Sequence, residues 1–190
     1  MALETVTSRK KKLWSFDQLI AEMPEANQPT ELWEGELIMT HSPTSAHQAV
    51  VARLVHDLSE FVSQHQLGQV YFAPLDVVFT QRRVVQPDII FISQAQQAII
   101  QDRIRGVVPD LIIEVVSIGT WRRDCVDKRT LYEQFGVSEY WIVDPEAETI
   151  EVLALQEGGY RLIGRFVPGQ AARSLLLTGF EIFVNEILGL

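Results

Sequence analysis

The sequence predicts a mixed α/β fold in which helices cover both faces of a central mixed sheet. Two short segments, 89–92 and 111–116, consist almost wholly of large apolar residues, as expected for strands that are buried on both faces. Two longer segments, 44–68 and 124–136, carry apolar residues at helical spacing. Strands that alternate with helices in this way are typical of α/β domains.

The first half of the chain carries clear signals for helix caps, turns and strands. In chain order, these signals predict a helix over 15–23 capped by Ser15, a bent strand or hairpin over 31–40 around Gly35, a helix over 42–68 capped by Thr44 or Ser45 and ended by Gly68, and strands over 70–80, 84–93 and 111–117.

The remaining segments complete the predicted sheet and its covering helices. They are a short helix or irregular excursion over 94–104, a helix over 124–136 closed by Gly136, a strand over 139–145, a hairpin of 149–156 with 160–166 around Gly158-Gly159, and a strand end with a short helix over 180–190.

The length of 190 residues, of which 47% are hydrophobic, suits one domain with a sizeable core. We expect this domain to span 13–190, after a disordered basic tail over 1–12. No apolar run reaches the roughly 20 residues that a membrane span needs, and no apolar stretch follows the N-terminal basic cluster as in a secretory signal. The lone Cys125 excludes an internal disulfide and a cysteine zinc cage, and it fits a cytoplasmic protein.

The net charge of −9 argues against a protein that coats nucleic acid, because such binding depends on neutralising phosphates. Three of the four lysines lie in the tail, so Lys128 is the one lysine of the expected domain. Arginine suits bidentate contact with phosphate. It supplies the remaining basic side chains, including Arg82-Arg83, Arg122-Arg123, Arg103 and Arg105. Each of them also fits an ordinary solvated surface charge.

Two acidic residues interrupt the predicted buried strands. Asp88 enters the apolar run IIFI, and Glu114 lies inside LIIEVV. A carboxylate inside a buried strand is costly unless a partner or a metal compensates it. With Lys128 on the following helix, the two acids predict a divalent-metal site for phosphodiester hydrolysis, with the carbonyl of Val115 as a further oxygen ligand.

Each of these residues also has a simpler explanation. Asp88 follows Pro87, and such a pair often begins a strand. Lys128 stands four residues after Asp124, which suits an intrahelical ion pair worth roughly 0.2–0.5 kcal/mol. Asp110 shares a strand face with Glu114 but lies about 13 Å away along the strand, so we expect it to be structural.

The segment from Asp88 to Glu114 resembles the PD-(D/E)XK nuclease superfamily. More narrowly, PDLIIEVVS, Arg123-Asp124 with Lys128, GVSEYWIVDP and the upstream WEGELIMTHSPTSAHQAVVARL are similar to the Uma-two family of restriction-like endonucleases. The resemblance covers roughly residues 15–185. It implies a restriction endonuclease-like fold with extra N-terminal strands and a C-terminal hairpin, and a site that uses Mg²⁺, with Mn²⁺ as a substitute.

Carried over by position, the resemblance makes Asp88 and Glu114 the two metal-site acids. The usual superfamily lysine would fall at Val116, so Lys128 is expected to reach the site from the next helix instead. Glu36 matches the acid of the Gly-Glu turn and His47 the early helix histidine. Glu36 also fits an exposed strand residue, and His47 also fits a local hydrogen bond at a helix start.

The chain departs from the family pattern at three positions. Ile118 and Gly119 stand where relatives often carry Pro-Ser, and Trp121 stands where a small or basic residue is common. These departures concern the shape of the loop and contact with DNA more than metal binding.

The expected function is therefore a magnesium-dependent endonuclease that acts on DNA. Two alternatives remain open: a nucleic-acid-binding or structural protein that keeps the fold with little catalysis, and a hydrolase of another phosphate ester. A homodimer would suit cleavage of both strands, with the C-terminal hairpin and FEIFVNEILGL as the interface.

Overall fold

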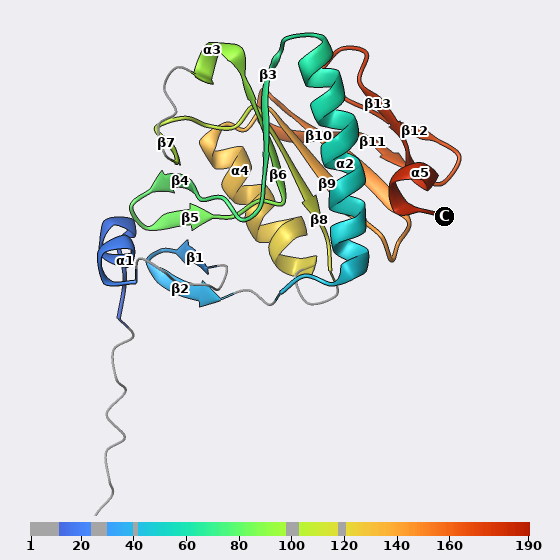
Figure 1. Cartoon of the computed structure of the whole chain (residues 1–190). Helices are drawn as coiled ribbons and strands as arrows, with labels where there is room; N and C mark the ends of the chain where they lie inside the picture. Colours follow the sequence, from blue (N-terminus) through green and yellow to red (C-terminus); the bar gives the residue numbers. More distant parts are fainter. Residues whose placement is uncertain (1–11, 24–29, 40–41, 98–102, 118–120) are drawn as a thin grey trace, which may run out of the picture.

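Figure 1 shows the computed structural model, which describes residues 12–23, 30–39, 42–97, 103–117 and 121–190. A six-stranded mixed sheet forms its centre, and the fold class predicted from the sequence is confirmed. Strands β8 and β9 run parallel, and the other neighbouring pairs run antiparallel. In sheet order the strands are β11 (Gly159–Phe166), β10 (Thr149–Gln156), β9 (Glu139–Asp144), β8 (Leu111–Val115), β6 (Ile89–Ser93) and β3 (Gly68–Phe72).

Helices pack on both faces of this sheet. The long helix α2 (Ser45–Gln64) and the short helix α5 (Val184–Leu188) cover one face, and α4 (Arg129–Phe135) covers the other, preceded by a π-helical segment, η1 (Arg123–Lys128) (Figure 1).

Alternate residues of β8 face the two layers. Leu111, Ile113 and Val115 belong to the apolar cluster under α2, and Ile112 belongs to the cluster under α4. Because side chains alternate along a strand, Glu114 points to the same side as Ile112, toward α4.

A second sheet lies beside the first and contains the extra N-terminal strands. Helix α1 (Phe16–Glu22) packs on it, with Phe16 and Leu19 buried against Leu32. In sheet order its strands are β2 (Glu36–Met39), β1 (Thr30–Trp33), β5 (Arg83–Val85), β4 (Val77–Thr80) and β7 (Ile104–Arg105). Short elements elsewhere are α3 (Gln94–Gln97) and the pair β12 (Ala171–Arg173) and β13 (Glu181–Phe183).

Helix α2 shows how well local signals place an element. Its cap is Thr44, whose hydroxyl accepts a hydrogen bond from the backbone N–H of His47. The helix ends at Gln64, four residues before the expected Gly68, which instead begins β3. A Cβ atom at Gly68 would lie 2.1 Å from the carbonyl oxygen of Ile92, so the close approach of β3 to β6 requires glycine there.

Three further expectations need adjustment. The strand expected over 70–80 divides around Ala73-Pro74 into β3 and β4, which belong to different sheets. The strand expected over 84–93 likewise divides around 86–88 into β5 and β6, one in each sheet. The helix expected over 124–136 ends as predicted at Gly136, which adopts a left-handed φ of 83°. Its first part, however, is π-helical rather than α-helical.

Little of the expected basic tail lies within the described residues. Lys12 is its one described member, and its ammonium lies 2.7 Å from Glu22 and 3.5 Å above the Trp14 ring. In the part of the chain that the structure describes, no helix is long and apolar enough to cross a membrane.

Candidate active site

The two acids predicted from the sequence lie opposite each other on neighbouring strands. Ile89 of β6 pairs with Ile113 of β8 in an antiparallel register. The next position along this register therefore places Asp88 opposite Glu114. Asp88 is held there because its Oδ2 accepts a hydrogen bond of 2.8 Å from the backbone N–H of Val115. Its side chain keeps 19% of its surface exposed, so one acid of the pair can be reached by solvent.

Glu114 is buried, with 2% of its surface exposed, and two donors converge on one of its oxygens. The ammonium of Lys128 lies 2.8 Å from Oε1, and the hydroxyl of Tyr132 donates to the same atom at 2.6 Å. These partners offset the cost of removing a carboxylate from water. The buried acid that the strand pattern revealed is therefore compensated by a cation and a phenol.

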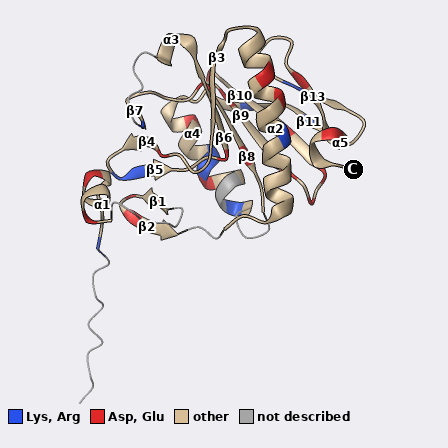
Figure 2. Ribbon diagram, in the orientation of Figure 1, with Lys and Arg blue, Asp and Glu red and all other residues tan. Residues whose placement is uncertain are grey.

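The helix that follows β8 supplies both donors from one face. Lys128 ends the π-helical segment, and Tyr132 lies one turn further on, in α4. Residues four apart on a helix are neighbours on its surface, so both side chains reach Glu114. Single π-helical turns occur frequently at functional sites. Figure 2 shows basic and acidic segments next to each other along the helix labelled α4.

A third acid, the buried Glu31, enters the site from the second sheet. Its Oε1 lies 3.3 Å from the ammonium of Lys128, and 2% of its surface is exposed. The indole N–H of Trp33 donates to its Oε2 at 3.0 Å, and the backbone N–H of Gln86 donates to its Oε1 at 3.2 Å. Lys128 thus lies between two fixed carboxylates, one from each sheet.

The sequence pointed to Glu36 in this hairpin and missed Glu31. Glu36 stands opposite Trp33 in the register of β1 and β2, and Glu31 stands opposite Ile38. Directly opposed residues share a sheet face, so Glu36 lies on the same face as Glu31. No comparable signal marked Glu31, because ELWEGE carries acids at 31, 34 and 36 and is not an apolar run like LIIEVV, which marked Glu114.

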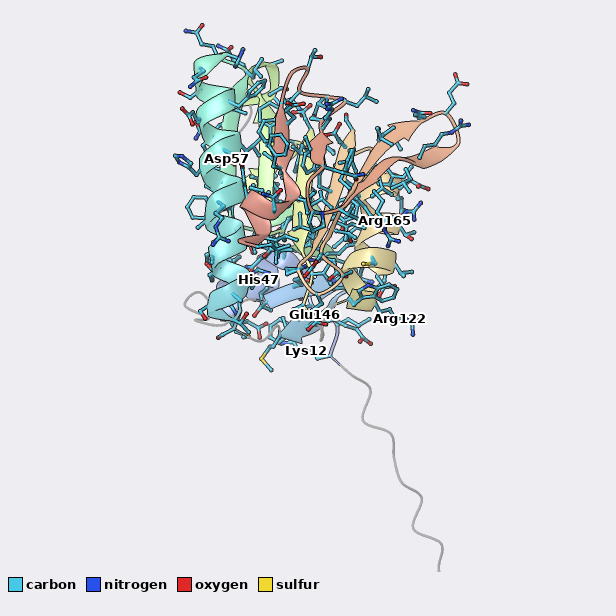
Figure 3. All side chains as sticks on the ribbon, turned by 90° about the vertical axis from the view of Figure 1, so that its right-hand side faces the viewer. Lys12, His47, Asp57, Arg122, Glu146 and Arg165 are labelled. Atoms are coloured by element: carbon cyan, nitrogen blue, oxygen red, sulfur yellow. The ribbon has the colours of Figure 1, made fainter. Side chains whose placement is uncertain are left out.

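His47 reaches the site from the first turn of α2. Its Nε2 lies 2.9 Å from the carbonyl oxygen of Val115 and 3.3 Å from Oδ2 of Asp88. Thr44 positions this turn by capping it. Figure 3 shows His47 at the end of the molecule where Arg122 also lies. The histidine therefore contacts both an expected metal-site acid and the carbonyl expected as a further ligand.

Burial keeps the hydroxyl of Tyr132 protonated. Removal from water raises the pKa of this phenol well above its usual value, and the negative charge of Glu114 raises it further. The ring is fully buried. Tyr132 therefore remains a hydrogen-bond donor toward Glu114 throughout the neutral range.

The residues at this end of the sheet offer oxygen atoms of the kind that hard cations prefer. Asp88 and Glu114 provide carboxylates, and Val115 provides a carbonyl. This donor set fits Mg²⁺ or Mn²⁺ better than a soft metal. Among the described residues, no group of three or more His, Cys, Asp and Glu residues is arranged as a metal site.

Several other polar residues singled out in the sequence have structural roles. Asp110 accepts hydrogen bonds from the backbone N–H of Ser93 and from the Gln96 side chain. Three of the arginines considered for phosphate contact are engaged by acids, in the pairs Arg83–Glu34, Arg103–Asp76 and Arg105–Asp17. These pairs reduce the positive potential that the arginines could offer to nucleic acid.

Comparison with known proteins assigns the family. Residues 16–185 match the sequence model of the Uma2 family, which carries the description "Putative restriction endonuclease". The chain belongs to the Uma2 family. The resemblance drawn from the strand and helix motifs is thereby confirmed, and with it a nuclease-type family for this chain.

A solved structure supports the fold of this Uma2 chain. The crystal structure of "a putative nuclease belonging to DUF820" from Anabaena variabilis superposes with a TM-score of 0.76 at 18% sequence identity. The match covers 92% of this chain and 97% of that one. A search of curated proteins gave no match. The structural likeness confirms the predicted nuclease-like α/β architecture over nearly the whole chain.

Proposed function

We propose that this Uma2 chain is a magnesium-dependent endonuclease that hydrolyses phosphodiester bonds of DNA. The observation that carries the proposal is the convergence of Asp88, Glu114 and Lys128 at one end of the central sheet. Family membership supports a nuclease-type activity. The choice of ion and of DNA as the substrate rests on the chemistry of the side chains.

Each residue has a distinct role in this proposal. Asp88, Glu114 and the carbonyl of Val115 hold the cation, which supplies charge neutralisation and a more acidic water when it is bound. Lys128 orients the attacking water or stabilises the charge that develops on the phosphoryl oxygens. His47 assists by orienting Asp88, to whose carboxylate its ring is adjacent.

The N-terminal hairpin contributes one of the two acids that hold Lys128 in place. Glu31 binds the ammonium of Lys128 opposite Glu114 and so fixes the position of this cation. Glu36, on the same face of the hairpin, is proposed as an assisting acid.

One observation favours a second candidate function, a nucleic-acid-binding protein that keeps the fold with little catalysis. Val116 occupies the position of the usual superfamily lysine, and it is buried in the apolar cluster under α4. In addition, both carboxylates that flank Lys128 draw on its charge. If Lys128 stays bound to both acids when DNA binds, the chain retains affinity for DNA but cleaves it slowly.

The deciding experiment is nicking of supercoiled plasmid in Mg²⁺ or Mn²⁺. It compares the wild type with Glu114→Gln and Lys128→Ala, and Asp110→Asn serves as the control. The control removes a charge next to the same strand, from a carboxylate that binds Ser93 and Gln96 instead of Lys128.

The proposal expects metal-dependent nicking by the wild type and the control, and its loss in both site variants. Nicking that persists in Glu114→Gln would place the activity elsewhere or in a contaminant. Binding of DNA without nicking by any form would establish the second candidate function.

A further inference from the structure

Tyr132 differs from the buried Tyr160 in what its hydroxyl contacts. The hydroxyl donates to Oε1 of Glu114, the atom that also receives the ammonium of Lys128. A buried tyrosine hydroxyl normally finds a partner, and a backbone carbonyl would have met that need. Here the partner is the acid on which the proposed metal site depends.

The ring of Tyr132 is held so that its hydroxyl has one direction available. Tyr140 packs edge-on against it with a centroid distance of 5.1 Å, and the tilted ring of Phe79 has its centroid 6.1 Å away. Helix α4 ends in the turn that follows Tyr132, where the backbone N–H of Val137 donates to the carbonyl oxygen of Tyr132 at 3.0 Å. With no exposed surface, the side chain has no alternative rotamer in solvent.

Two donors on a single oxygen also restrict the carboxylate of Glu114. An oxygen that accepts from both Lys128 and Tyr132 cannot rotate away without losing both bonds. Groups that orient a metal ligand in this way raise its affinity for the ion, and their removal typically costs 10–100-fold in metal affinity or activity.

We propose that Tyr132 is a positioning residue that holds the Glu114 carboxylate in the orientation in which it binds the divalent cation. The inference rests on the proposed function, because it assumes that Glu114 is a metal ligand. It assigns to Tyr132 a role in metal affinity in addition to packing in the core.

The chain offers a matched control in Tyr160. This tyrosine belongs to the same apolar cluster, is 7% exposed, and donates its hydroxyl to the backbone carbonyl of Val137 at 2.7 Å. Tyr160→Phe therefore removes one buried hydrogen bond without touching Glu114. Tyr132→Phe removes a bond of the same kind that ends on Glu114.

The experiment measures Mn²⁺ binding to the full chain by electron paramagnetic resonance for the wild type, Tyr132→Phe and Tyr160→Phe. We expect Tyr132→Phe to bind Mn²⁺ roughly 10–100-fold more weakly and Tyr160→Phe to stay within about twofold of the wild type. In parallel nicking assays, Tyr132→Phe should need more metal for half-maximal rate, and the rate should recover when metal is saturating.

A second measurement does not require the Tyr132→Phe variant to fold. Incorporation of 3-fluorotyrosine gives a ¹⁹F resonance for Tyr132, which should shift when Mg²⁺ is added to the wild type. The shift should be absent in Glu114→Gln, and the Tyr160 resonance should hardly move.

The outcomes separate the two proposals. If the wild type binds Mn²⁺ and Tyr132→Phe binds it equally well, the role of Tyr132 is overturned while the metal site stands. That role is overturned as well if the Tyr132 resonance does not respond to Mg²⁺ in a wild type that binds the ion. If the wild type itself binds neither ion, the metal-dependent function fails, and the role of Tyr132 fails with it.

Discussion

Two buried glutamates on adjacent parallel strands show how similar burial serves different ends. Glu114 on β8 and Glu139 on β9 are 2% and 1% exposed. The carboxylate of Glu139 accepts from four neutral donors at 2.7–2.8 Å, namely the Trp141 indole, the Ser174 hydroxyl and the backbone N–H groups of Leu175 and Leu176. Glu114 instead binds a lysine and a phenol.

The difference lies in what each arrangement can still do. Glu139 binds the loop after β12 to the start of β9, and because all its donors are neutral, this contact is a structural one. Glu114 shares a cation with a second acid, Glu31, and lies opposite a partly exposed one, Asp88. Burial of an acid is thus a weak sign of function, whereas a shared lysine beside a reachable acid is a stronger one.

The largest expected effects come from replacing each of the two buried glutamates, Glu114 and Glu139, with glutamine. Glu114→Gln should lower metal-dependent nicking by more than about 100-fold, beyond the roughly 10–100-fold cost of removing groups that only orient a ligand. Glu139→Gln should leave the rate per folded molecule near that of the wild type. It should, however, lower the free energy of unfolding by about 3 kcal/mol, because donors that faced an anion meet an amide.

Plasmid nicking together with urea unfolding measures both variants. The assignment of a functional role to Glu114 and a structural role to Glu139 is wrong if Glu139→Gln loses activity while it remains folded. It is also wrong if Glu114→Gln destabilises the chain more than Glu139→Gln does.

The next prediction concerns stability and follows from removing the shared cation. Lys128→Met leaves Glu31 and Glu114 buried without the ammonium between them, which should cost about 3–5 kcal/mol of unfolding free energy. Adding Glu31→Gln to the same chain removes one of the two charges and should recover part of that loss. Urea denaturation of the single and double variants gives the coupling. Additive effects would mean that Glu31 and Lys128 do not interact.

The smallest expected effect concerns the tyrosine with a neutral partner. Burial raises the pKa of Tyr160 above that of an unfolded tyrosine, and the charge of Glu133 adds to the shift. Above about pH 10 the unfolded chain releases this proton and the folded chain keeps it. The unfolding free energy should therefore fall with pH, by about 1.4 kcal/mol per pH unit for each such tyrosine.

Urea midpoints between about pH 9 and pH 11, on either side of the ordinary tyrosine pKa, measure this slope. The unfolding free energy should fall less steeply with pH in Tyr160→Phe than in the wild type, although the variant is less stable at the lowest pH. Parallel curves for the two chains would show that Tyr160 ionises freely in the fold.

Much of this arrangement could be predicted because its signals are local. The apolar runs around Asp88 and Glu114 identified both strands and both acids, since a charge within such a run is conspicuous. The spacing of the following helix put Lys128 and Tyr132 on one face. Family motifs then connected these residues to one site.

The missed features depend on contacts between distant segments. The hairpin carries acids at Glu31, Glu34 and Glu36, and its own sequence does not say which of them is buried. That choice follows from the register of β1 against β5 and from the backbone of Gln86. The bond from Tyr132 to Glu114 likewise depends on how closely α4 packs on β8, a distance that no local pattern encodes.

The position of Glu31 also ties the surroundings of Lys128 to the docking of the two sheets. Since this acid comes from a sheet separate from the one that carries Asp88 and Glu114, Lys128 contacts both Glu31 and Glu114 only when the two sheets have docked. A folding intermediate with the central sheet formed and the N-terminal hairpin detached would hold its lysine against one acid instead of two. On the proposed function, such an intermediate would be poorly equipped to cut DNA, so cutting would require that the two sheets are docked.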